Sequence, residues 1–121
     1  MNSSQKKTSK NKTIQINLAL NYGSKFEILN AIKKLSINKD KINEKNLSKY
    51  LLTKNIPDPE LLIRTGDKKR LSNFLLWQIA YAELYFTEVF WPDFSDEDLY
   101  KAIASYQKRE RRFGKTSEQL N

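Results

Sequence analysis

Two arginines and a serine follow a short apolar run in the middle of the chain. Arg64 ends this run, which covers residues 61–63, and after a glycine turn Arg70 and Ser72 come next. Guanidinium groups suit phosphate oxygens, and ligands of open α/β sheets bind at the carboxyl ends of strands. Ser72 or Asn73 is also placed to cap a following helix, whose free N–H groups favour anions. The spacing therefore predicts a phosphate or diphosphate site, and two surface arginines around an ordinary turn are the alternative.

Glu83 is the one acid inside the most apolar stretch of the chain, residues 74–86. An unpaired carboxylate is costly to bury, so this side chain must reach the surface, an arginine or a metal ion. A surface position at the boundary of an element is the ordinary interpretation. A Mg²⁺ ion that bridges the carboxylate and a substrate phosphate is the functional one.

The chain has no cysteine and no histidine, which narrows the chemistry that it can perform. Thiol catalysis, zinc–cysteine sites and the Ser-His-Asp triad are excluded. The apolar stretch 74–86 is too short to span a bilayer, and the polar N-terminus lacks the apolar core of a signal peptide. We therefore expect a cytoplasmic protein that works through carboxylates, basic side chains, hydroxyls or a carboxylate-bound metal.

The net charge of +8 is concentrated at the two ends of the chain. Residues 1–13 carry four lysines and no acid, and residues 108–121 carry five basic and two acidic side chains, whereas residues 14–107 are nearly neutral. Basic side chains at the end of a helix usually complement the helix dipole. A nucleic-acid-binding domain is a remote alternative, because no recognised binding motif accompanies the basic ends.

Strand patterns occur at three places. Apolar and polar residues alternate over 14–20, which predicts a strand. The run 61–63 leading into Arg64 is apolar throughout, as in a buried parallel strand, and residues 84–90 regain strand character. Strands that alternate with helices point to an α/β layer with parallel strands.

Helix patterns lie between and after these strands. Phe26, Leu29, Ile32 and Leu35 recur at helical spacing, and a second helix around residues 43–51 has Asn43 as its cap. A third helix is expected after Ser72. A fourth begins with the capping box at residues 95–98 and ends in the basic run 108–112. Residues 1–13 have almost nothing to bury and are expected to be a disordered basic leader.

Several longer segments, taken in order, carry a family resemblance: residues 17–23, 57–66, 70–78, 81–86, 91–94 and 109–114. They closely resemble the cis-prenyltransferases, the family of undecaprenyl diphosphate synthase and isoprenyl transferase, over about residues 13–115. The resemblance implies an α/β fold, here a partial parallel sheet with flanking helices. It covers only the C-terminal half of the family's domain. We therefore expect residues 14–115 to be that half and residues 116–121 to be a tail.

The resemblance also implies an activity and a set of site residues. The family elongates an allylic diphosphate, commonly farnesyl diphosphate, with isopentenyl diphosphate and Mg²⁺, and its bacterial product is a lipid carrier for cell-wall synthesis. Such an enzyme meets the membrane through its lipid product. By resemblance, the isopentenyl diphosphate would be bound by Arg64, Arg70 and Ser72. Glu83 would help to bind Mg²⁺, and Arg112 and Gly114 match an Arg-x-Gly element that reaches the partner's site in this dimeric family.

The chain departs from the family pattern at three places. Ser24 stands where the family's Asn-Tyr-Gly-Gly segment has its second glycine, and Asp67-Lys68 alters the turn between the two arginines. No segment resembles the family's Asp-Gly-Asn-x-Arg-Trp loop, which carries the key aspartate. The resemblance therefore implies no catalytic residue in this chain.

Three hypotheses follow from these patterns. The first is a truncated or split isoprenyl transferase that is inactive alone and acts as a homodimer, or with an N-terminal fragment or a full-length homologue. The second is a non-catalytic partner subunit of a cis-prenyltransferase complex, which need not keep Arg64, Arg70, Ser72 and Glu83. The third is the nucleic-acid-binding domain, and no nucleic-acid partner is expected under the first two.

Overall fold

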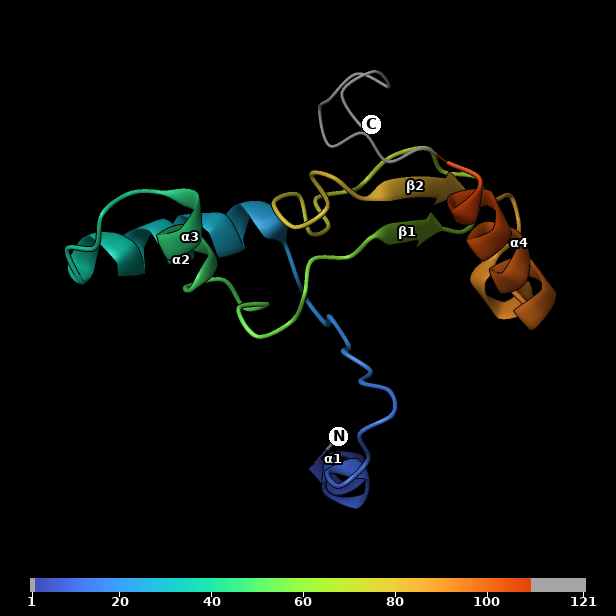
Figure 1. Ribbon diagram of the computed structural model, residues 1–121, viewed down its shortest axis with the longest axis horizontal. Helices are drawn as coiled ribbons and strands as arrows, with labels where there is room; N and C mark the ends of the chain where they lie inside the picture. The colour runs from blue at the N-terminus through green and yellow to red at the C-terminus, as the bar shows by residue number, and fades with distance from the viewer. Residues whose placement is uncertain (1, 110–121) are drawn as a thin grey trace, which may run out of the picture.

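A computed structural model describes residues 2–109 of the chain. In order, the elements are α1 (Asn2–Thr8), α2 (Ser24–Ile37), α3 (Glu44–Ser48), β1 (Leu61–Arg64), β2 (Glu83–Phe86), a 3₁₀ turn (Trp91–Asp93) and α4 (Asp96–Gln107). Figure 1 shows α2 and α3 together at one end, the two strands in the middle and α4 at the carboxyl end of the strands. The expected class, helices with a parallel sheet, is confirmed.

The sheet within residues 2–109 consists of β1 and β2, which run parallel. Leu61 pairs with Glu83 at one end of the ladder, and Arg64 pairs with Phe86 at the other. The pairing continues past both ends, because Glu83 N–H donates to the Glu60 carbonyl at 2.9 Å and Thr87 N–H to the Arg64 carbonyl at 3.0 Å. The second strand ends at Phe86, so it is shorter than the predicted 84–90.

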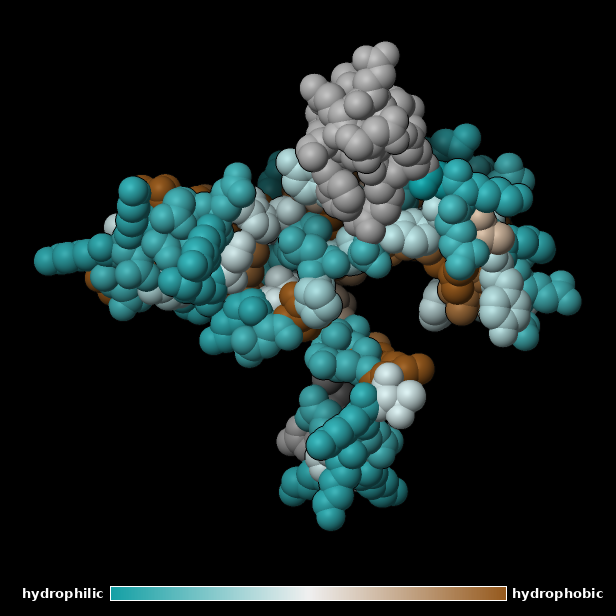
Figure 2. Space-filling model, in the orientation of Figure 1, coloured by the Kyte–Doolittle hydropathy of each residue, from teal (hydrophilic) through white to brown (hydrophobic). Residues whose placement is uncertain are grey.

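The predicted strand over residues 14–20 is wrong for this structure. The segment is extended but pairs with neither strand, and Ile14, Ile16, Leu18 and Leu20 are 67–80% exposed. Figure 2 shows hydrophobic atoms along the segment that joins α1 to α2. A strand exists through its ladder partners, and the described part of the chain offers this segment none. The alternating pattern is thus real, but its apolar side chains are uncovered.

The predicted helix over 25–35 is confirmed as α2, but it buries a different face. Phe26 is 73% exposed, and Leu29 and Ile32 are exposed too. The buried positions include Ala31 and Leu35, which form the main core cluster with Leu47 and Leu51. Because α3 covers that side of α2, most of the predicted apolar stripe faces solvent.

Asn43 caps α3 as predicted. Its side-chain oxygen accepts a hydrogen bond from Asn46 N–H at 2.8 Å. Tyr50 and Trp77 pack against the core cluster from its edge. The cap therefore fixes the start of the short helix that covers α2.

The predicted helix after Ser72 is wrong for this structure, because residues 72–81 form a series of turns. Ser72, Asn73 and Leu75 take left-handed backbone angles, with φ of 50°, 61° and 45°. These angles are incompatible with a right-handed helix. Asn73 instead bonds to the start of α2, as described below.

Residues 2–8, which belong to the predicted disordered basic leader 1–13, form the helix α1. The segment contains neither glycine nor proline, and Lys6 and Lys7 in its last turn complement the helix dipole. The Thr8 hydroxyl donates to the Ser4 carbonyl at 2.9 Å. In Figure 1, α1 projects away from the strands, so it contributes nothing to their packing.

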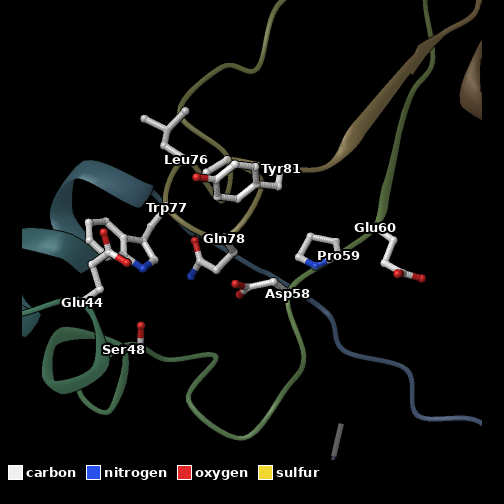
Figure 3. Close-up of a pocket in the computed structure, with 10 residues that line it drawn as sticks. Glu44, Ser48, Asp58, Pro59, Glu60, Leu76, Trp77, Gln78 and Tyr81 are labelled. Atoms are coloured by element: carbon white, nitrogen blue, oxygen red, sulfur yellow. The ribbon is translucent and has the colours of Figure 1, made fainter. Parts of the chain in front are cut away.

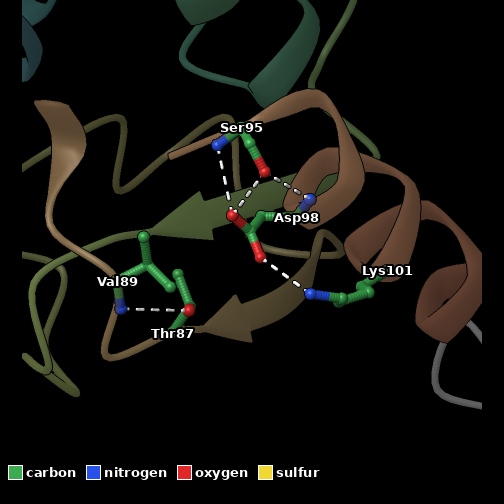
Figure 4. Close-up of polar contacts among 5 residues, drawn as sticks. All are labelled: Thr87, Val89, Ser95, Asp98 and Lys101. Carbon is green, nitrogen blue, oxygen red and sulfur yellow. Dashed lines mark hydrogen bonds and ion pairs between the residues drawn. The ribbon is translucent and has the colours of Figure 1, made fainter. Parts of the chain in front are cut away.

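The capping box of α4 is confirmed. Ser95 accepts from Asp98 N–H, and the Asp98 carboxylate accepts from Ser95 N–H at 3.1 Å and from its hydroxyl at 2.8 Å (Figure 4). The Ser95 hydrogen bonds, assisted by Lys101, lower the pKa of Asp98 to about 2. Ala102 faces inward and is fully buried. No helix among the described residues has the length and apolarity needed to cross a bilayer.

Candidate functional site

Arg64 lies at the carboxyl end of β1, where the sequence places it. The turn after it needs glycine, because Gly66 has φ of +80°. Gly66 N–H donates to the Val89 carbonyl at 2.9 Å, and Asp67 N–H donates to the Thr87 carbonyl at 3.0 Å. These bonds join the turn to the segment that follows β2. The backbone at Arg64 is therefore fixed by β1 on one side and by this turn on the other.

Arg70 and Ser72 lie beyond this turn, and both are exposed. The predicted helix N-terminus, with its free N–H groups, is not present behind them. An anion would therefore be bound by side chains and not by helix N–H groups. The candidates are the guanidinium of Arg70, the hydroxyl of Ser72 and the half-buried Arg64. A half-buried arginine at the end of a parallel strand and an exposed arginine in the loop after it still suit a ligand with two phosphate groups.

Glu83 meets an arginine. Arg109, just beyond α4, donates from one guanidinium nitrogen to the Glu83 carboxylate at 2.8 Å and to the Leu84 carbonyl at 2.9 Å. The side chain of Glu83 is 26% exposed. Of the three sequence interpretations, the arginine partner is the one that the structure shows. Arg109 is thus more than a partner of the helix dipole.

Glu83 and Arg64 lie at opposite ends of the ladder. Glu83 pairs with Leu61, three residues before Arg64 along β1. At about 3.3 Å per residue, this spacing separates the two backbone positions by roughly 10 Å. The structure therefore places Arg64 at the carboxyl end of β1 and Glu83 at the start of β2, and Arg70 and Ser72 lie in the loop that connects the two strands. Arg112 and Gly114, the remaining predicted site residues, lie outside the described residues.

Comparison with known proteins decides the family. Residues 1–114 match the family model of the undecaprenyl diphosphate synthases. The chain belongs to this prenyltransferase family. An isoprenyl transferase of Neisseria meningitidis is 53% identical over 114 residues, and one of Clostridium acetobutylicum is 49% identical over 124 residues. These matches cover 93% and 94% of the chain but 46% and 48% of the relatives, so the chain spans about half of their length.

Two solved structures share the fold. A probable undecaprenyl diphosphate synthase from Campylobacter jejuni has a TM-score of 0.81 and 39% identity, and covers 94% of this chain. Lavandulyl diphosphate synthase from Lavandula x intermedia, solved with dimethylallyl diphosphate, has a TM-score of 0.86 and 37% identity. This chain corresponds to 54% and 52% of those two structures. The fold is thus part of the cis-prenyltransferase fold.

The prenyltransferase resemblance implies Mg²⁺, and the described residues test that implication. Residues 2–109 contain no group of three or more acidic side chains that could hold a metal ion. A single carboxylate can still hold Mg²⁺ when substrate phosphates supply further oxygens. Glu83 fits that role as one contributor. Its carboxylate would then bind the metal ion as well as its present partner, Arg109.

Sequence reasoning missed a buried carboxylate in this prenyltransferase chain. Glu27 of α2 is only 4% exposed and accepts hydrogen bonds from the Tyr22 hydroxyl, Leu52 N–H and the Gln78 amide. The Gln78 amide also donates to Thr53 at 2.8 Å. Burial and the Glu27 hydrogen bond raise the pKa of Tyr22. Gln78 inside the apolar stretch was the available signal, because a buried amide needs polar partners.

Gln78 also lines a cavity of about 680 Å³ beside α3, shown in Figure 3. Three carboxylates line the same cavity: Glu44, Asp58 and Glu60. Such a lining repels a diphosphate. Neither arginine of the candidate site nor Ser72 lines it. The cavity is therefore lined by other residues than the candidate anion site.

Proposed function

We propose that this chain supplies the isopentenyl diphosphate half of a cis-prenyltransferase active site. The observation that carries the proposal is the placement of Arg64 at the carboxyl end of a parallel strand, followed by Arg70 and Ser72, in a chain of this family. Arg64 and Arg70 would bind the diphosphate oxygens, and Ser72 would donate a hydrogen bond to them. This grip holds the five-carbon nucleophile in place for the allylic partner.

The metal and the partner complete the proposal. Mg²⁺ bound with the help of Glu83 would assist departure of the allylic diphosphate. Arg112 and Gly114 would reach the site of a second subunit in a dimer. Because no segment of the sequence resembles the loop that carries the family's key aspartate, we propose that the chain by itself forms no polyprenyl product.

Uncovered apolar surface supports the need for a complementary polypeptide. The side chains that alternate along residues 14–20, together with Phe26 and Leu29 of α2, are exposed and apolar. Both groups would be buried by further strands of the same sheet and by helices that pack on it. We propose that an N-terminal portion of the enzyme or a full-length homologue covers them. A purely non-catalytic partner subunit would bind in the same way but would not need Arg64 or Arg70.

Binding of isopentenyl diphosphate tests the half-site. Calorimetry with the full chain is expected to detect binding, and Arg64→Ala or Arg70→Ala is expected to raise the Kd by about ten- to a hundredfold, the cost of losing charged hydrogen bonds. Lys68→Ala, in the turn between the two arginines, is the matched control and should change the Kd far less. Equal Kd values for all four proteins would contradict the proposal and favour the partner-subunit alternative.

A further inference from the structure

Two segments that are far apart in the sequence are joined at the start of α2. Ser24 N–H donates to the Asn73 carbonyl at 2.9 Å, and Lys25 N–H donates to the Asn73 side-chain oxygen at 2.9 Å. In return, the Ser24 hydroxyl accepts from Leu76 N–H at 2.9 Å. We call these three hydrogen bonds, formed by Ser24, Lys25, Asn73 and Leu76, the clasp.

The surroundings of the clasp are packed. Ser24 is fully buried. The rings of Tyr22 and Phe74 meet edge to face, with centroids 5.7 Å apart. A side chain at Gly23 would come within 3.0 Å of the Asn73 amide nitrogen, so the chain passes as close as glycine allows. The segments 22–25 and 73–76 therefore behave as one unit.

The backbone beside the clasp is strained. Ser72, Asn73 and Leu75 hold left-handed φ angles of 50°, 61° and 45°, a conformation that a branched side chain such as leucine rarely adopts. Such angles persist only where surrounding contacts over-determine them. Asn73 and Leu76 are the residues through which the clasp reaches this backbone, and Ser72 is the immediate neighbour of Asn73. The clasp thus restrains the backbone next to Ser72 and, through it, the orientation of the Ser72 side chain.

We propose that Ser24 and Asn73 are positioning residues for the diphosphate. By fixing residues 72–76 to the start of α2, they hold Ser72 and Arg70 at a set distance from Arg64. This inference rests on the proposed diphosphate site. A ligand with two phosphate groups needs the guanidinium groups of both arginines at a matching separation, whereas a single phosphate needs only one of them. The clasp therefore contributes to the preference for a diphosphate over a monophosphate.

The serine is the part of the clasp at which the chain departs from the resembled family segment. Ser24 stands where the resembled family segment has a second glycine, and glycine has no hydroxyl to accept the Leu76 N–H bond. The part-buried Leu76 N–H would then lose this protein partner. Ser24→Ala removes the bond with the smallest change of shape and without a change of charge.

The test compares pyrophosphate with inorganic phosphate. Calorimetry with the full chain is expected to give tighter binding of pyrophosphate than of phosphate. Ser24→Ala and Asn73→Ala should raise the Kd for pyrophosphate by about five- to tenfold, the effect of one lost hydrogen bond, and leave the Kd for phosphate unchanged. Ser36→Ala, at the far end of α2 and exposed, is the control and should alter neither value.

Two failures can be told apart. If the unaltered chain binds pyrophosphate and the clasp variants keep the same preference for it, the clasp inference is overturned and the diphosphate site stands. A parallel loss of affinity for both anions would also overturn it, because general loosening weakens both. If the unaltered chain binds no pyrophosphate, the proposed function itself fails, and the positioning role fails with it.

Discussion

Glu27 shows at the residue scale how a polar group can organise a small core. Its carboxylate takes hydrogen bonds from three separate segments, which contribute Tyr22, Leu52 and Gln78. A buried carboxylate is tolerated when its oxygens are fully used. The network therefore connects α2 to the turn that contains Leu52 and to the turn that contains Gln78.

Replacing this carboxylate by an amide should destabilise the chain. In Glu27→Gln, one acceptor oxygen becomes a donor, and at least one of the three N–H or O–H donors then loses its partner. We expect the free energy of unfolding to fall by about 1–3 kcal/mol in urea titrations followed by circular dichroism. Glu88→Gln, on an exposed glutamate, is the control. Equal stabilities of the two variants would show that the network carries no such energy.

Local sequence patterns predict the site residues better than their partners. The position of Arg64 follows from an apolar run, and the cap Asn43 from its spacing to the next residues. The contact between Ser24 and Asn73 joins residues almost fifty positions apart, and no local pattern encodes it. The Glu83–Arg109 pair has the same character: the sequence requires a partner for the acid but does not say which of the basic residues it is.

At the element scale, capping residues decide where helices form. Ser95 and Asp98 start α4 as the pattern predicts. Ser72 and Asn73 resemble a cap equally well, yet Asn73 serves α2 instead and the apolar stretch after it stays in turns. Propensity is a weak prior that tertiary contacts override. The face that a helix buries is similarly set by its neighbours, which is why Phe26 is exposed and Ala31 is buried.

The α4 cap should weaken in acid. The pKa of Asp98 is about 2 in the folded chain, below its ordinary value of 3.8. A lowered folded-state pKa means that the contribution of the cap is complete above pH 3.8 and is lost as the pH falls through about 2.

Nuclear magnetic resonance can follow this change at the Asp98 carboxyl and the Asp98 amide. The first turn of α4 is expected to loosen between these two pH values. In Asp98→Asn, which cannot carry the charge, the first turn should show no transition in this range. A midpoint near 3.8 in the unaltered chain would contradict the strength of the cap.

At the scale of the whole molecule, the chain has more apolar surface than its own elements cover. The strands pair only with each other within the described residues, and the apolar side chains of the alternating segment 14–20 are exposed. The sequence pattern predicts a strand over this segment, and the structure forms none there. Alternation reports which side chains share a face, but a strand also needs a ladder partner, and the described residues offer this segment none.

Reconstitution of activity tests the central claim most directly. The chain is mixed with the N-terminal portion of a full-length relative, labelled isopentenyl diphosphate, farnesyl diphosphate and Mg²⁺, and the products are separated by chain length. We expect no polyprenyl product from the chain by itself, product from the mixture, and its loss in Arg64→Ala. Polyprenyl product from the chain by itself, or product from the mixture that survives Arg64→Ala undiminished, would contradict the assignment of the half-site.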